Sequence, residues 1–549
     1  MLLNKLSQLT VKPLALLTLI GALCISLPIL VIASTFFTGS FDVWNHLYDT
    51  VLWDYLSNSF WLVIGVGLGV LLIGVPTAWL TSSYQFPGQK IFSWAMMLPL
   101  AMPAYIIAYT YTGMLDFAGP VQTNLRHITG WKYGDYWFFN IRSLSGAILM
   151  LTLVLYPYVY LLARTAFIDQ TSRLIEAGQS LGYSHRQTIT KLALPLARPA
   201  IIAGLTLALM ETLADFGTVQ YFGVNTFTTG IFRAFYGFGD TPAATQLATI
   251  LLSFVILLIA IEKYSRRQLR YHAVKGKTSN KIQLHGAKAW FACFACFLPL
   301  ALGFLIPALQ LIYWTLFKAQ PGERFLQLAW NSFYLAFLAA LMAAFFALLF
   351  AYAKRLHSQS KTVLTATSIA SMGYALPGTI IAIGIIIPFS WLDHQIIDFL
   401  KTSFDIEIGL IFSGTIFALL FAYTVRFLAV SFGAIDSGLQ KIKPNLDNAA
   451  RLLGRSPSQV LKVIHFPLLT GPIFTALLIV FVDVLKELPA TLILRPFNFN
   501  TLAVRAYELA SDERLIDAAP ASLLIVLVGL LPVILLNRSI HSSAMKKAD

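Results

Sequence analysis

Four carboxylates lie within two strongly apolar stretches of this 549-residue chain. Glu211 and Asp215 belong to LMETLADFGTVQYFG, and Asp483 and Glu487 belong to FVDVLKELPATL. The members of each pair are four residues apart, which predicts that both carboxylates share one helix face. Each residue of the second pair follows its counterpart by 272 positions. Charged side chains inside apolar spans are functional candidates, and carboxylate oxygens suit hard cations such as ferric iron. The pattern therefore predicts a route for a cation or polar solute.

The depth of these carboxylates favours the outer side of a membrane. A helix that begins near Arg198 places Asp215 roughly 26 Å along its axis. The four carboxylates and Lys486 carry a formal charge of −3. Two interpretations stay open: the side chains hold a gate through helix caps and ion pairs such as Asp483–Lys486, or they contact the substrate directly. Four tyrosines could add phenol oxygens, although an aromatic belt at the membrane surface explains them more simply: Tyr105, Tyr109, Tyr158 and Tyr160.

The composition predicts a membrane-embedded protein. Hydrophobic residues make up 57% of the chain and charged residues 12%, with a mean hydropathy of +0.72, whereas soluble domains have about 25% charged residues. A span needs about 20 mostly apolar residues. The first stretch is too long for a signal-peptide core, so we expect it to be retained. The expected spans are 14–37, 60–82, 92–115, 144–168, 196–216, 245–263, 289–317, 332–353, 364–390, 409–430, 468–489 and 518–536.

The net charge of +14 needs no nucleic-acid partner. If the N-terminus is cytoplasmic, most lysines and arginines fall in cytoplasmic segments, as the positive-inside rule requires. The densest basic run extends from Lys263 to Lys288. Three cysteines are too few for a disulfide framework, and Cys293 and Cys296 lie in an apolar stretch where packing explains them.

The two halves of the chain are repeats. Asn58-Ser59-Phe60 recurs as Asn331-Ser332-Phe333 at the start of the second span of each half. An even number of spans in each half gives both halves the same orientation, which predicts a parallel repeat. We expect an all-α integral membrane protein of about 12 transmembrane helices, with a first repeat at 1–263, a basic cytoplasmic linker at 264–288 and a second repeat at 289–549.

Two polar segments also repeat, at 176–195 and 448–467. Each has small residues near its start, a glycine six positions after the start, and a proline thirteen positions after that glycine. Between apolar spans, such segments must face water. A glycine permits a backbone turn that other residues resist, so we expect two short helices that break near it. The prolines suit the first turn of the next span. The matched positions are Gly182 with Gly454 and Pro195 with Pro467.

These segments resemble the EAA loop, the ATPase-coupling loop of permeases in bacterial ABC importers. That loop reads Glu-Ala-Ala, three residues, Gly, nine residues and Ile-x-Leu-Pro. The first copy contains Glu176, Ala177, Gly178, Gly182, Leu192, Leu194 and Pro195. The second copy contains Asn448, Ala449, Ala450, Gly454, Ile464, Phe466 and Pro467. Gly178 replaces the second alanine of the pattern, and Asn448, which follows Asp447, replaces the glutamate.

The resemblance implies a type I importer permease whose loops dock on an ATPase and transmit its closure. That coupling role falls on Glu176, Ala177, Gly182, Pro195, Asn448, Ala449, Gly454 and Pro467. Small residues allow close contact, and a glutamate can meet a basic group or cap a helix. The alternative is that both segments are solvated loops with glycine turns.

Within this superfamily, 211–224 and 483–523 resemble the fused permeases for ferric iron. The resemblance implies import of Fe(III) across a bacterial inner membrane by alternating access, from a periplasmic ferric-binding protein. Two copies of a cytoplasmic ABC ATPase would bind ATP and Mg²⁺, and this chain would bind no cofactor and catalyse nothing itself. Transient iron contacts would fall on Glu211, Asp215, Asp483 and Glu487, with Lys486 beside them. Fused thiamine permeases share the layout, so thiamine or another substrate is the alternative.

Two other classes compete with this interpretation. A secondary transporter driven by an ion gradient would explain the repeats and the carboxylates, but not two segments with matched glycines. A membrane-embedded enzyme would need a catalytic motif. HExxH does not occur in the sequence, and GxSxG occurs only as Gly178-Gln179-Ser180-Leu181-Gly182, inside the first polar segment. Gly276-Lys277-Thr278 is not a phosphate-binding loop, because Tyr271 occupies the position of its first glycine.

Overall fold

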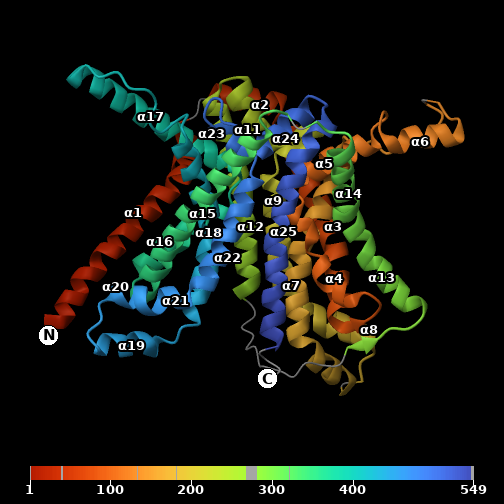
Figure 1. The fold of residues 1–549 in the computed structure, drawn as a ribbon, viewed down its shortest axis with the longest axis horizontal. Helices are drawn as coiled ribbons and strands as arrows, with labels where there is room; N and C mark the ends of the chain where they lie inside the picture. The colour runs from red at the N-terminus through yellow and green to blue at the C-terminus, as the bar shows by residue number, and fades with distance from the viewer. Residues whose placement is uncertain are drawn as a thin grey trace. The chain divides into compact units, whose positions relative to one another are not determined.

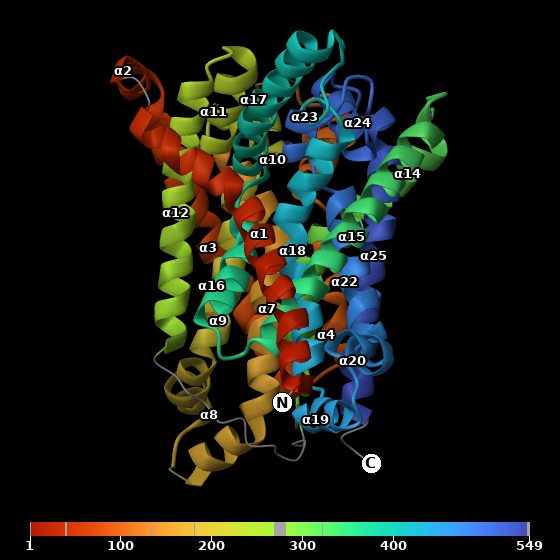
Figure 2. The ribbon, with the colours of Figure 1, turned by 90° about the vertical axis from the view of Figure 1, so that its left-hand side faces the viewer.

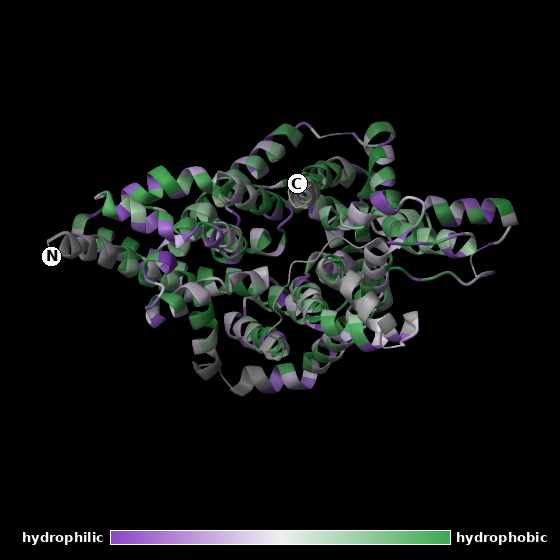
Figure 3. Ribbon diagram, turned by 90° about the horizontal axis from the view of Figure 1, so that it is seen from below, coloured by the Kyte–Doolittle hydropathy of each residue, from purple (hydrophilic) through white to green (hydrophobic). Residues whose placement is uncertain are grey.

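The computed structural model describes residues 2–38, 41–132, 134–180, 182–267, 281–320 and 322–545, and its described part is almost entirely helical (Figure 1). Ten helices within this part are long and apolar enough to cross a membrane, or up to twelve if each of two bent pairs forms one span. Hydrophobic residues predominate along the long helices (Figure 3). The expected all-α membrane fold is confirmed.

The described part of the first half contains twelve helices. They are α1 (Leu2–Thr38), α2 (Phe41–Thr50), α3 (Leu52–Ser83), α4 (Gln89–Ala95), α5 (Ala104–Leu115), α6 (Pro120–Thr129), α7 (Leu144–Ser180), α8 (His185–Thr188), α9 (Leu194–Ala214), α10 (Gly217–Tyr221), α11 (Phe227–Phe232) and α12 (Thr241–Arg267).

The described part of the second half contains thirteen helices. Its helices are α13 (Ala287–Leu300), α14 (Ile306–Phe317), α15 (Phe325–Leu356), α16 (Lys361–Ala370), α17 (Gly378–Phe404), α18 (Ile416–Gln440), α19 (Pro444–Leu452), α20 (Pro457–Val460), α21 (Phe466–Leu468), α22 (Thr470–Leu485), α23 (Pro489–Leu494), α24 (Leu502–Ser511) and α25 (Leu515–Met545).

Several shorter elements join these helices. Two 3₁₀ turns are η1 (Leu98–Ala101) and η5 (Gly373–Ala375), and four π turns are η2 (Ile189–Ala193), η3 (Arg233–Gly237), η4 (Ala301–Leu305) and η6 (Leu461–His465). Strand β1 (Tyr84–Gln85) pairs in parallel with β2 (Ile282–Gln283), so that Tyr84 lies opposite Ile282. Residues 268–280 of the predicted linker, which include Gly276-Lys277-Thr278, lie outside the described residues.

The third span of each half differs from the prediction. The stretches 92–115 and 364–390 were each expected as one helix, but each is divided into a helix, a 3₁₀ turn and a second helix. In the first half the two parts are bent by 90°. The second helix of each stretch begins immediately after Pro103 or Pro377, and the residue before each proline is extended. Proline disfavours helical backbone at the preceding residue, which explains both breaks.

The chain packs as two compact units that exchange helices between the repeats. Unit 1 comprises Met1–Val43, Ala234–Thr249 and Gly322–Arg505, and the remaining residues form unit 2. In unit 1, α1 from the first half packs along α16 and α17 from the second (Figures 1 and 2). In unit 2, α14 from the second half packs on α5 and α25. Each unit therefore contains residues from both expected repeats. The repeat boundaries remain a prediction from the sequence.

Close packing in unit 1 depends on small side chains. Helix α15 contacts α18 and α22 along an alanine-rich face. Small residues let helices approach closely in a membrane, where van der Waals contact supports association. Seven alanines of α15 are at most 2% exposed: Ala336, Ala339, Ala340, Ala343, Ala347, Ala351 and Ala353.

Candidate coupling segments and translocation site

Both predicted coupling segments turn at their matched glycine. Gly182 has φ +73° and Gly454 has φ +77°, a left-handed conformation that side chains with a Cβ resist. In the second segment this glycine separates the short helices α19 and α20, as predicted. In the first segment only the helix after the glycine is short, because the preceding helix is the end of the 37-residue α7. The expectation of two short helices is wrong for that copy.

A π turn precedes the proline of each segment. The N–H of Leu194 donates to the carbonyl of Ile189, and the N–H of Phe466 donates to the carbonyl of Leu461. Pro195 and Pro467 lack an N–H, and their rings exclude the carbonyl four residues earlier, so the helix widens by one residue. Pro195 lies in the first turn of α9, as expected. Pro467 lies instead in the three-residue α21, and a bend of 73° separates α21 from α22, so the expectation is wrong for that copy.

The departure of Gly178 from the EAA pattern has a packing cause. Gly178 is buried, and a Cβ at this position would clash with the side chain of Thr188 in α8. The equivalent positions in the second segment are Ala450 and Val460, both buried. The side chains of Glu176 and Ala177 lie outside the described residues.

The second segment exposes an apolar surface. Asn448 and Ala449 are exposed on α19, and the adjacent Leu452 and Leu453 are 89% and 83% exposed. Exposed leucines rimmed by polar residues mark protein interaction sites. This surface lies at the opposite end of unit 1 from α23 (Figure 1).

A charged network attaches the second segment to the end of α15. Arg355 donates from Nε to Oδ2 of Asp447 at 2.8 Å and from Nη2 to Oδ1 at 3.1 Å. His465 in η6 contacts Oδ1 of the same carboxylate through Nε2 at 2.8 Å. Burial alone would raise the pKa of Asp447, but the hydrogen bonds from Arg355 and His465 hold it below its usual value. Sequence reasoning noted Asp447 only as the neighbour of Asn448, because its partners are distant in the chain.

In unit 1, both candidate carboxylates are paired with bases. Asp483 contacts Nζ of Lys486 at 2.9 Å, the i,i+3 pair that the sequence suggested. Glu487 is 4% exposed and accepts from Nη1 of Arg426 at 2.8 Å. It also accepts the N–H groups of Ala490 and Thr491, each at 3.0 Å. Glu487 therefore caps α23 and forms a buried ion pair.

In unit 2, the matching carboxylate also caps a helix but lacks a base. Asp215 accepts from the N–H of Val219 at 3.1 Å and from Oγ1 of Thr218 at 3.0 Å, both in α10. Asp215 and Glu211 are partly exposed. Neither forms an ion pair within the described part of the chain. Asp483 and Glu487 are therefore paired with Lys486 and Arg426, whereas Glu211 and Asp215 have no basic partner among the described residues.

Two expectations about these carboxylates are corrected. Helix α9 ends at Ala214 and α22 ends at Leu485, so Asp215 and Glu487 lie beyond the helices that carry Glu211 and Asp483. The members of each pair do not share a helix face, because the second member instead accepts the free N–H groups of the next helix. The formal charge of −3 omitted Arg426, which neutralises Glu487.

Two of the four candidate tyrosines lie near this end of unit 2. The rings of Tyr105 and Tyr109 are 5.7 Å apart, and Tyr109 contacts Tyr221 at 4.6 Å. The buried hydroxyl of Tyr109 has no hydrogen-bond partner among the described residues. Tyr160 is instead fixed by the side chain of Thr81 and the carbonyl of Ser93. The structure therefore does not bring the four tyrosines into one site.

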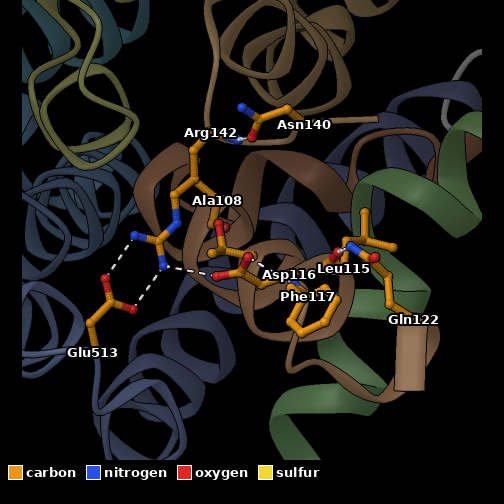
Figure 4. Close-up of polar contacts among 9 residues, drawn as sticks. Ala108, Leu115, Asp116, Phe117, Gln122, Asn140, Arg142 and Glu513 are labelled. Atoms are coloured by element: carbon orange, nitrogen blue, oxygen red, sulfur yellow. Dashed lines mark hydrogen bonds and ion pairs between the residues drawn. The ribbon is translucent and has the colours of Figure 1, made fainter. Parts of the chain in front are cut away.

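A second polar cluster in unit 2 surrounds Arg142 (Figure 4). Its guanidinium forms a bidentate pair with Glu513, with both distances 2.7 Å, and contacts Asp116 at 3.2 Å. It also lies over the ring of Tyr221, at 5.2 Å from the centroid. The hydrogen bonds from Arg142 lower the pKa of Glu513 against the opposing effect of partial burial. The cluster joins the segments that precede α7 and α25 to the segment after α5.

Comparison with known proteins supports this architecture. The sequence model of the family described as "Binding-protein-dependent transport system inner membrane component" matches residues 70–271 and 343–543, once in each half. The chain is 26% identical over 495 residues to the Fe(3+)-transport system permease protein FbpB 2 of Haemophilus influenzae, covering 88% of this chain and 90% of that protein.

Other relatives match most of the chain or only about a third of it. The ferric transport system permease protein FbpB of Actinobacillus pleuropneumoniae is 25% identical over 537 residues, which span 90% of this chain and 73% of that protein. The molybdenum transport system permease protein ModB of Haemophilus influenzae is 29% identical over 206 residues, 36% of this chain and 87% of that protein. The double match to the family and the repeated spans lead to one assignment. This chain is a fused, multi-pass member of the binding-protein-dependent transport system inner membrane components, the permeases of ABC importers.

Proposed function

We propose that this permease imports ferric iron, with energy from ATP hydrolysis on partner subunits. The observation that carries the proposal is the similarity to an Fe(3+) permease over 88% of this chain and 90% of that relative. The unpaired carboxylates Glu211 and Asp215 are chemically suited to a hard cation. They are poorly suited to the oxyanions of the molybdenum and sulfate permeases, whose similarity covers only 34–40% of the chain.

The coupling segments are the proposed docking sites for two copies of a cytoplasmic ABC ATPase that binds ATP and Mg²⁺. The glycine turns at Gly182 and Gly454 and the exposed Leu452 and Leu453 support this role. The same role is proposed for Glu176, Ala177, Pro195, Asn448, Ala449 and Pro467. This places both segments and the N-terminus in the cytoplasm, with the ends of α9 and α22 facing the periplasm.

Transport would follow alternating access. Closure of the ATPases would move the coupling segments and open the opposite side to a periplasmic ferric-binding protein. Released iron would pass Glu211 and Asp215, where a negative charge is free to attract it. Asp483, Lys486 and Glu487 are also proposed for the path. Lys486 and Arg426 already pair with the two carboxylates, so their contacts with Fe(III) would be weaker.

The test is uptake into proteoliposomes that contain the complete complex. Labelled ferric iron and labelled thiamine are each offered with a candidate binding protein, with and without internal ATP. We expect ATP-dependent uptake of iron and none of thiamine. ATP-dependent uptake of thiamine alone would contradict the substrate. Uptake driven by a proton or sodium gradient without ATP would contradict the transporter class.

A further inference from the structure

We propose that Arg355 is a positioning residue that transmits motion of the second coupling segment, 444–467, to α15 and α18. We call its contacts the Arg355 clamp. The clamp comprises Arg355, the Asp447 carboxylate and the carbonyls of Leu439 and Ile442. This inference rests on the proposed coupling role of the segment and adds a part that the EAA pattern does not contain.

The clamp joins three helices at one side chain. Arg355 lies in the last turn of α15, and its side chain is 15% exposed. Its Nη groups donate to the carbonyls of Leu439 and Ile442 at the end of α18, while Nε and Nη2 hold Asp447 in α19. A bidentate arginine–carboxylate pair fixes orientation as well as distance. One guanidinium therefore links the ends of α15, α18 and α19.

The rest of the segment is attached to the same end of α15. Tyr352, one turn before Arg355, donates its hydroxyl to the carbonyl of Pro457 at the start of α20. Its ring packs edge-on against His465 at 5.6 Å, and His465 contacts Asp447. A movement of the segment must either carry α15 with it or separate the partly buried pair of Arg355 and Asp447, which is costly.

The first half shows why such a clamp is needed only in the second. Helix α7 runs without interruption from its span into the first coupling segment, so any movement of that segment acts directly on the span. In the second half the corresponding helix stops at Gln440, and α19 starts anew at Pro444. The position equivalent to Pro444 is Ser172, which does not break a helix. The clamp bonds residues on both sides of this break and bridges it.

The first half also lacks the residues that would form a clamp. Helix α15 aligns with α3 at the 273-residue offset of Asn58 and Asn331, so the counterpart of Arg355 is Ser82. At the 272-residue offset of the coupling segments, the counterparts of Asp447 and His465 are Ile175 and Ala193. None of these can form an ion pair. The first half thus connects its coupling segment to the span through one continuous helix, and the second half does so through the Arg355 clamp.

The experiment measures substrate uptake per ATP hydrolysed by the reconstituted complex, with labelled ferric iron as the probe. Arg355→Ala should still co-purify with the ATPase and hydrolyse ATP, because Asn448, Ala449 and the exposed leucines are unchanged. Uptake per ATP should fall at least about fivefold, the lower range of allosteric couplings. Arg355→Lys, which keeps the charge but not the two-point contact, should fall between Arg355→Ala and the native protein.

Two further variants keep the test decisive. Asp447→Asn removes the charge with little change in shape, and it should reproduce the loss even where Arg355→Ala reduces the amount of folded protein. Arg324→Ala, an exposed arginine at the opposite end of α15, is the matched control and should leave the ratio unchanged. Uptake per ATP within twofold of native in both clamp variants would overturn the inference. Failure of the native chain to bind the ATPase would instead overturn the proposed function.

Discussion

The ends of α9 and α22 occupy equivalent places in the two repeats but carry different charge. Asp215 and Glu487, 272 residues apart, each cap the short helix that follows the span. Glu487 is neutralised by Arg426 and Asp483 by Lys486, whereas Glu211 and Asp215 have no basic partner in the described part of the chain. Asp215 and Glu487 thus share the role of a helix cap. They differ in that Asp215 and its neighbour Glu211 are not paired with a base, and we propose that these two carboxylates lie on the substrate route.

The largest expected effect comes from breaking the buried pair in unit 1. Arg426→Ala leaves Glu487 buried without its base, so we expect the protein to lose about 3–5 kcal/mol of stability. The midpoint of thermal unfolding in detergent measures this loss. Arg426→Met combined with Glu487→Gln removes both charges and should recover most of it. A double variant no more stable than Arg426→Ala would contradict the ion-pair explanation.

The next effect tests the free charge in unit 2. Glu211→Gln should lower ferric-iron uptake about tenfold, equivalent to about 1.4 kcal/mol in the barrier, without changing association with the ATPase. The matched variant is Asp483→Asn, which alters a carboxylate that Lys486 already neutralises, and it should change uptake less than twofold. Equal losses for the two variants would show that the difference in pairing has no functional meaning.

A smaller effect separates the cap from the charge at Asp215. Asp215→Asn keeps an acceptor for the first turn of α10, whereas Asp215→Ala removes it, so only the alanine variant should lose about 1 kcal/mol of stability. Both variants remove the charge and should lower iron uptake to a similar degree. Unfolding midpoints and uptake in the same preparations distinguish the two roles. Normal uptake by Asp215→Asn would assign this residue to the cap alone.

The smallest effect concerns the cluster around Arg142, whose guanidinium pairs with Glu513 and lies over the ring of Tyr221. Arg142 lowers the pKa of Glu513 below 4.5, so the pair stabilises the fold fully above that pH, and its contribution falls as pH drops through the lower pKa of the folded state. Both side chains are substantially exposed, so we expect less than about 1 kcal/mol. Unfolding midpoints between pH 3 and 6, compared with Glu513→Gln, measure it. A pH dependence identical in the variant would exclude this pair as its source.

The sequence carried enough information for the spans and the matched segments, because both depend on local pattern. Apolar stretches of span length, glycines at a fixed offset and prolines at helix starts can all be recognised without tertiary contacts. The breaks after Met102 and Leu376 were also predictable in principle from the following prolines. The same signal at Pro444 would have separated α18 from α19.

Apart from the local pair Asp483–Lys486, the ion pairs could not be predicted in the same way, because they depend on which helices pack together. Arg426 and Glu487 are 61 residues apart, and Arg142 and Glu513 are 371 apart. No periodicity links such positions. The i,i+4 spacing of the carboxylates was misleading for a related reason: it assumed that each helix continues through both residues, whereas the second carboxylate makes its hydrogen bonds with the next helix.

The exchange of first spans between the two units limits how this protein can be assembled. A polypeptide that ended before α13 would lack the helix that completes unit 2, and one that began after α12 would lack α1 from unit 1. If the chain were divided within the linker into two separate polypeptides, each would need helices from the other to complete the core of its unit. Joining both in a single translation product guarantees equal supply of two mutually dependent pieces.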